Sequence, residues 1–186
     1  MVCATWVIAV ASIAAALAAC CSAYVTAGEM KRQNETLKEQ MNAYRLALSV
    51  DVVLKFDVQF NEPNFKAVRS RAAKALLSKS NEGDADDVFD FFDTIGLFVK
   101  LGALSNELAY SVFFHWINLY WEAGKKYIAA KQTETSTVWR NLRMICEGVR
   151  EIEKERDPNS EDLKMPESRL REQLKEEIDL ADNVSH

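Results

Sequence analysis

Five polar side chains between residues 107 and 122 are the ones in this sequence whose types and spacing could support chemistry. Glu107, Ser111, His115, Asn118 and Glu122 follow one another at intervals of 4, 4, 3 and 4 residues, so they lie along one narrow line of a helix, here termed the polar stripe. A histidine flanked by carboxylates can act as a general base or bind a metal. An enzyme or effector that uses this stripe is therefore one hypothesis for the function.

A structural role of the polar stripe is the competing interpretation. A protein zinc site needs more ligands at matched spacing, and a di-iron bundle needs Glu-x-x-His pairs. Glu122 is followed three residues later by Lys125 instead of a histidine. We therefore predict no metal ion, no cofactor and no catalytic residue, and we expect His115 to be either a hydrogen-bonded histidine or one at the rim of the core.

Two other sets of residues that suggest chemistry are better explained structurally. Asp84 and Asp86 resemble the start of a calcium loop, but Phe89 and Ile95 occupy the positions that require a glycine and a bidentate acid. Cys146 is expected to be a small buried hydrophobic residue, because a reactive cysteine needs surroundings that stabilise its thiolate.

The polar stripe belongs to a helix that is apolar over most of its remaining surface, which is typical of the central helix of a core. This helix follows a break near Gly102, and Ser105 or Asn106 is expected to cap it. A later helix is expected to open at Thr135 or Ser136. It carries an apolar seam that contains Val138, Leu142, Ile145, Val149 and Ile152, and Asp157-Pro158 ends it.

Two further helices lie on either side of this pair in the sequence. Asn61 followed by Pro63 predicts a helix start, with Asn61 as the cap, and the helix runs to about Ser78. The last helix, about Pro166 to Ala181, has only a thin apolar stripe amid charged residues. It is expected to be a surface helix or an arm that binds a partner.

The helix that begins at Pro63 carries a candidate basic surface. Several acidic residues follow this helix between Glu82 and Asp93. This separation of a basic helix from an acidic stretch can mark a surface that binds anionic lipid or a partner. Alternatively, the acidic residues can complement the start of the next helix and the neighbouring basic face. The basic surface consists of Lys66, Arg69, Arg71 and Lys74.

The first 28 residues contain no charged side chain, which makes them a candidate membrane anchor. As a helix, Cys3 to Val25 extends roughly 34 Å at about 1.5 Å per residue, enough to cross a bilayer with modest tilt. Lys31, Arg32, Lys38 and Arg45 follow the run, so the positive-inside rule places the N-terminus outside and the body in the cytoplasm. Membrane lipid is the first expected partner.

A periplasmic lipoprotein is the alternative for the same run. Leu17-Ala18-Ala19-Cys20 matches a lipobox, in which Cys20 would be lipidated after cleavage. However, residues 1–5 lack the Lys or Arg that a secretory signal normally carries.

A heptad pattern follows the charge-free run, with Asn34 at one of the apolar positions of the repeat. It predicts either a short coiled coil, in which Asn34 sets the register of a homo-oligomer, or a single amphipathic helix on its own domain. The apolar members are Met30, Leu37, Met41, Tyr44 and Leu48. In residues 50–60, apolar and mostly polar side chains alternate, which is the pattern of a β-strand. No second strand is available to pair with this segment, so we predict a helix.

Composition excludes several classes of protein. The net charge of −5 argues against bulk binding of nucleic acid. Three of the four cysteines lie in the charge-free run, which rules out a disulfide framework in the body. Only six glycines and three prolines occur, which favours helices.

A set of short motifs gives the chain a resemblance to a known family. The motifs are Phe-Phe-Asp-Thr-Ile-Gly at 91–96, Lys-Leu-Gly-Ala-Leu at 100–104, Tyr120-Trp121 and Trp139, with Phe-Asn-Glu-Pro at 60–63, Arg69 and Ala-Ala-Lys-Ala-Leu-Leu at 72–77 upstream. The chain resembles an uncharacterised bacterial family, a domain of unknown function that pairs an N-terminal membrane helix with a helical cytoplasmic body. The likeness covers roughly residues 1–152 and implies no activity. It supports a helix for residues 50–60.

These motif residues also have a direct physical interpretation. Phe91, Phe92 and Ile95 are expected to anchor one core helix. Gly96 is expected to allow the close approach of a neighbour, the Tyr120-Trp121 ring pair. Trp139 completes this set of structural residues.

The sequence as a whole predicts an all-α protein. A transmembrane anchor at 1–28 continues into a juxtamembrane helix or coiled coil at 29–60, and a helical bundle of about four to five helices occupies 61–156. Residues 157–186 form a linker, a surface helix and a tail. The expected role is that of a scaffold, sensor or interaction protein in the bacterial inner membrane, with an unidentified protein partner.

Overall fold

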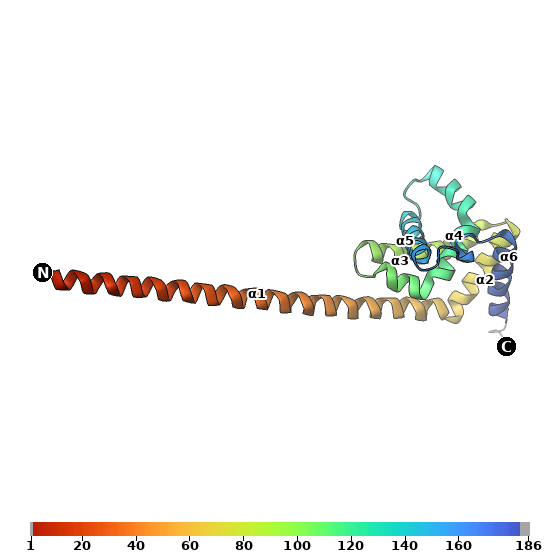
Figure 1. Ribbon diagram of the computed structural model, residues 1–186. Helices are drawn as coiled ribbons and strands as arrows, with labels where there is room; N and C mark the ends of the chain where they lie inside the picture. The colour runs from red at the N-terminus through yellow and green to blue at the C-terminus, as the bar shows by residue number, and fades with distance from the viewer. Residues whose placement is uncertain (1, 183–186) are drawn as a thin grey trace. The chain divides into compact units, whose positions relative to one another are not determined.

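The computed structural model describes residues 2–182, and within them the side chains of residues 22, 24 and 26–179. Its regular elements are all helical, and residues 2–182 contain no strand (Figure 1). The all-α prediction is therefore confirmed. The α-helices are α1 (Val2–Asn61), α2 (Pro63–Ser78), α3 (Asp86–Lys100), α4 (Asn106–Glu134), α5 (Arg140–Arg156) and α6 (Glu167–Asp182), and the short 3-10 helices are η1 (Glu82–Ala85) and η2 (Glu161–Leu163).

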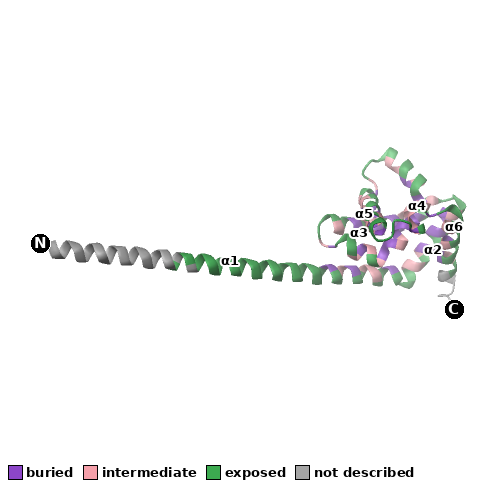
Figure 2. Ribbon diagram, in the orientation of Figure 1, coloured by how far each residue is buried: buried purple, intermediate pink, exposed green. Residues whose placement is uncertain are grey.

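The chain divides into two compact units, Met1–Leu46 and Ala47–His186. The first unit consists of the earlier part of α1, and its described side chains are exposed (Figure 2). In the part of the chain that the structure describes, no helix combines the length and apolarity needed to cross a bilayer. The predicted anchor, Cys3 to Val25, falls on residues whose side chains lie outside this description, apart from Ser22 and Tyr24.

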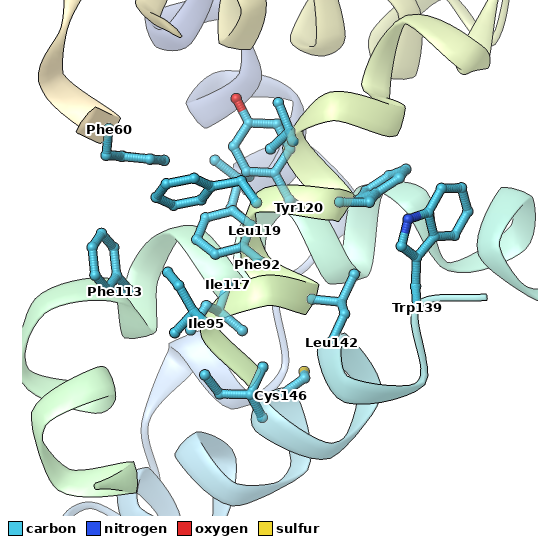
Figure 3. Close-up of a cluster of buried hydrophobic side chains, with 14 of the residues drawn as sticks. Phe60, Phe92, Ile95, Phe113, Ile117, Leu119, Tyr120, Trp139, Leu142 and Cys146 are labelled. Atoms are coloured by element: carbon cyan, nitrogen blue, oxygen red, sulfur yellow. The ribbon is translucent and has the colours of Figure 1, made fainter. Parts of the chain in front are cut away.

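The second unit holds the core, to which every helix from α2 to α6 and the last part of α1 contribute. Figure 3 shows core side chains of α1, α3, α4 and α5. Helix α2 packs chiefly on α6, and α5 packs on both α3 and α4. Residues 50–60 are helical, as predicted, because the helix turns Val53 and Phe60 inward, where each keeps 3% or less of its surface exposed. Fully buried aromatic rings fill the centre: Phe89, Phe92, Phe113 and Tyr120.

The break between α3 and α4 is where the sequence predicts it. Gly102 takes a positive φ of 71°, a conformation that costs glycine little. Ser105 then caps α4, because its Oγ accepts a hydrogen bond from the Leu108 N–H at 3.2 Å.

The predicted cap of α2 is wrong. Helix α1 continues through Asn61, whose side chain donates to the Asp57 carbonyl oxygen at 2.9 Å, and Glu62 takes the extended cap position without a side-chain bond. The helix extends this far because Phe60 is buried and must keep its place on the inner face. Pro63 does occupy the start of α2, as predicted.

Helix α5 starts later than the sequence suggests, because its cap comes from another helix. Helix α4 extends to Glu134, and α5 begins at Arg140, so neither Thr135 nor Ser136 opens it. The carboxylate of Asp93, on α3, accepts from the backbone N–H groups of Asn141 and Leu142 at 2.8 and 2.9 Å. These bonds satisfy two of the donors that every helix start leaves free.

Gly96 lies where α3 and α5 approach most closely. A Cβ atom at this position would lie 2.3 Å from the backbone oxygen of Asn141, and real Cβ atoms are essentially never so close to backbone. The neighbour that Gly96 admits is therefore the start of α5, and the predicted Tyr120-Trp121 pair is wrong. Asp93 and Gly96 act together as a clamp that joins α3 to α5.

Gly96→Ala is expected to destabilise the protein by about 1–3 kcal/mol, because the added methyl group forces the backbones of α3 and α5 apart. Chemical denaturation followed by far-ultraviolet circular dichroism measures the change. The matched control is Gly148→Ala in α5, where the nearest atoms belong to the flexible side-chain end of Asn106, at 2.9 Å. Equal destabilisation by both substitutions would contradict the clamp.

Candidate functional site

The polar stripe lies along α4, but the structure uses it to hold other segments in place. Glu107 forms an ion pair with Arg156 at 2.7 Å, and the Ser111 hydroxyl donates to the Glu107 carbonyl oxygen at 2.8 Å. Glu122 pairs with Arg150 of α5, and with Lys125 at 3.5 Å. Both carboxylates of the stripe are thus engaged by arginines of α5 or its end.

The middle of the stripe contacts the segment that contains η2. Asn118 is fully buried, and its amide nitrogen donates to the Asp162 carbonyl oxygen at 2.6 Å. Arg150 also donates to this segment, at the Leu163 carbonyl oxygen, at 2.6 Å. Asn118 of the stripe and Arg150 of α5 therefore fasten residues 162–163 to α4 and α5.

His115 lies half-buried within this arrangement. Its ring meets the Trp116 ring edge to face, with centroids 4.8 Å apart. Burial lowers the pKa of His115 below its usual value, and the nearby Asp162 opposes that effect only in part. The imidazole is therefore neutral at physiological pH.

One member of the predicted basic surface is not on the surface. Arg71 and Lys74 are exposed and Lys66 is partly exposed, but Arg69 keeps only 4% of its surface exposed. The prediction is wrong for Arg69 because this residue lies on the inner face of α2, beside Ala72, Ala73 and Leu76.

Arg69 forms a buried ion pair with Glu177 of α6. Its Nε donates to Glu177 Oε2 at 2.8 Å, and its second terminal nitrogen donates to Oε1 at 2.6 Å. This two-pronged geometry matches the planar guanidinium to the carboxylate. The remaining nitrogen donates to the carbonyl oxygen of Phe60 at 3.1 Å.

Aromatic groups complete the surroundings of this ion pair. The guanidinium carbon of Arg69 lies 3.8 Å from the centre of the Phe60 ring and 4.5 Å from that of Trp116. The Tyr120 hydroxyl donates to Glu177 Oε2 at 3.0 Å, and Figure 3 shows this hydroxyl pointing away from the apolar cluster. Burial and the Glu177 carboxylate raise the pKa of Tyr120 well above its usual value. We term these five residues the Arg69 cluster.

Sequence reasoning missed the Arg69 cluster because its two charged members are 108 positions apart. One signal was available: on a helical projection, Arg69 falls within the apolar face of Phe65, Val68, Ala72 and Leu76. A charge on a core face requires a buried partner. Nothing in the charged sequence of α6 singles out Glu177 as that partner.

The motif residues are mostly core residues. Phe91, Phe92, Ile95, Gly96 and Tyr120 are buried, whereas Trp121 is only partly buried.

Trp139 anchors the turn before α5. It keeps 6% of its surface exposed, and its indole nitrogen donates to Asp90 of α3 at 2.7 Å. The Phe-Phe-Asp-Thr-Ile-Gly segment therefore supplies both core rings and the α3–α5 clamp.

Cys146 is a buried apolar residue, as predicted. It retains 1% of its surface exposed, and burial raises the pKa of its thiol to about 12, so the reactive thiolate does not form at neutral pH (Figure 3). Among the described residues, no three or more His, Cys, Asp and Glu side chains are grouped to hold a metal ion.

Arg69→Met is expected to destabilise the protein by about 3–5 kcal/mol, because it leaves the Glu177 carboxylate buried without its counter-charge. The double variant Arg69→Met/Glu177→Leu should recover a large part of this loss, which a double-mutant cycle of denaturation curves measures. The control is Asp51→Asn, which breaks an exposed pair with Lys55 and should cost less than about 1 kcal/mol. A loss no larger for Arg69→Met than for Asp51→Asn would refute this role.

A family model described as "Domain of unknown function (DUF4760)" matches residues 6–149, which include Arg69, the motif at 91–96 and Trp139. Helix α6, with Glu177, lies outside the matched residues. No curated protein and no solved structure matches the chain. Because the matched residues make up more than half of its length, the chain belongs to the DUF4760 family.

Proposed function

We propose that the protein is a membrane-anchored scaffold that self-associates through α1 and presents its helical body to a protein partner. The observation that carries the proposal is the exposure of a regular apolar line on α1. Met30, Leu37 and Met41 leave 54–58% of their surface exposed, and Tyr44 leaves 71%. A helix with such a line in water is stabilised when another helix covers it.

The heptad assignment favours a second copy as the covering helix. Met30, Leu37 and Tyr44 fall at d positions, and Asn34 falls with Met41 at a positions. A single Asn at an a position sets the register and the number of strands in a coiled coil.

The flanking positions are compatible with a parallel homodimer. The e positions are the basic residues Lys31, Lys38 and Arg45. Across the dimer, Gln33 at a g position faces Lys38, and Gln40 at the next g position faces Arg45. Because no two cations face each other in these pairs, the homodimer avoids like-charge repulsion.

The sequence of the first 28 residues supports the membrane anchor. It contains no charged side chain, and basic residues follow it at once from Lys31. In this proposal the anchor crosses the bacterial inner membrane once, with its N-terminus outside and the body in the cytoplasm. A lipid on Cys20 is the alternative attachment. The spanning helix and the lipid attachment can be distinguished, because a different substitution releases the protein from the membrane in each case.

The self-association prediction concerns Leu37→Glu/Met41→Glu. Each apolar side chain buried in the seam contributes about 1.5–3 kcal/mol, so the double variant should weaken dimerisation by about a hundredfold or more. Crosslinking in membranes and light scattering of the purified protein measure the dimer. The control is Leu46→Glu, an exposed position outside the seam. A wild-type protein that is monomeric in both measurements would refute the proposal.

The anchor prediction concerns Val10→Arg/Ile13→Arg. An arginine at the centre of a spanning helix costs about 2.5–3.5 kcal/mol, so this variant should lose most of its alkali-resistant membrane fraction. Thr36→Arg, beyond the run, and Cys20→Ala should both keep that fraction. Release of the protein by Cys20→Ala, together with the loss of a lipid from its measured mass, would establish the lipoprotein instead.

A further inference from the structure

A groove lies between α2, α4 and α6 of the body. Its volume is about 260 Å³, and its floor is aliphatic. Leu76 and Leu174 keep 5% or less of their surface exposed, while Leu77 and Leu170 are partly exposed. Ala123 of α4 completes the floor.

The rim of the groove carries four cations, of which two form no ion pair among the described residues. Lys125 and Arg171 each pair with a rim glutamate, Glu122 and Glu167, at 3.5 and 3.0 Å. Lys79 and Lys126 also line the groove, and neither forms an ion pair within the described residues.

The three acids of the rim, Glu82, Glu122 and Glu167, cancel only part of the charge of its four cations. Glu122 is also held by Arg150, a residue of α5 that does not line the groove. Glu82 is the remaining acid among the lining residues. Two ammonium groups therefore remain available above an apolar floor, at the positions of Lys79 and Lys126.

The carboxyl of Glu167 shows that these cations favour a negative charge at the rim. The pKa of its carboxyl is lowered by its hydrogen bond to Arg171, and Lys79 and Lys126 add to the effect from a greater range. Lys79, Lys126 and Arg171 thus act on the same region at the start of α6. The positive end of the α6 dipole reinforces the preference for an anion there.

We propose that this groove binds a single-chain anionic amphiphile, an acyl chain with a carboxylate head. The leucine floor takes the chain, and Lys79 and Lys126 hold the head. The volume of about 260 Å³ is about nine times the roughly 30 Å³ that one water molecule occupies, which suits a stretch of one chain and not two. The inference is independent of how the protein reaches the membrane.

The test uses the full-length protein in nanodiscs of neutral lipid, with decanoate as the probe. Isothermal titration measures binding of decanoate, decanol and decylammonium, each against empty nanodiscs. Decanoate should bind at least about tenfold more tightly than decanol, and decylammonium should bind most weakly. Equal binding of all three probes would overturn the proposal, because it would show that charge at the rim plays no part.

Substitutions locate the binding. Lys79→Gln/Lys126→Gln should weaken decanoate binding by about tenfold or more, and Leu77→Gln should weaken it through the floor. The control is Lys100→Gln/Lys154→Gln, which removes the same charge from α3 and α5 away from the groove. Equal effects of the two lysine pairs would overturn the proposal, and unchanged circular dichroism confirms that each variant folds.

The length of the acyl chain of the probe gives a second, independent test of binding in the groove. Each methylene that enters the groove should raise affinity about fourfold, until the groove is full near the length of decanoate, after which affinity should level off. Continued growth of affinity through longer chains would indicate adsorption to lipid and would count against the groove. The protein could instead bind only vesicles of anionic lipid and show no binding of decanoate. This result would indicate that Lys79 and Lys126 contact a membrane surface, and it would overturn the proposal.

Discussion

The buried pair of Arg69 and Glu177 is the interaction on which the arrangement of the body depends. Arg69 keeps 4% of its surface exposed, and because a guanidinium stays protonated, burying it without a counter-charge would be costly; α6 therefore lies where its carboxylate meets α2. Phe60, Trp116 and Tyr120 bring the last part of α1 and the centre of α4 to the same point. With α6 in this position, its residues form one wall of the groove between α2, α4 and α6.

A second constraint joins α3 to α5, and it gives the family motif a physical meaning. Asp93 supplies the cap that the sequence before α5 lacks, and Gly96 leaves room for the backbone at Asn141. One turn earlier, Asp90 accepts from the indole of Trp139, so the turn before α5 is held as well. The motif thus determines how a helix begins more than 40 residues later in the chain.

Local signals in the sequence predicted local structure well. The cap at Ser105, the break at Gly102 and the interior position of Cys146 each depend on neighbours within a few residues or on one apolar face. The errors arose where partners are distant. The start of α5 depends on a carboxylate of α3, and Arg69 was placed on the surface because its partner is 108 residues away. The polar stripe was found correctly as a line on one helix, but its arginine partners on α5 could not be read from spacing.

The position of Glu177 outside the residues matched by the family model has a consequence for the family itself. Arg69 lies inside the matched region and its counter-charge lies outside it, so the matched residues of this chain do not by themselves neutralise the buried arginine. A member without an α6 would need an apolar residue in place of the arginine, or a carboxylate supplied by another element or another molecule. In this chain that carboxylate comes from α6, the helix that closes the body over Arg69.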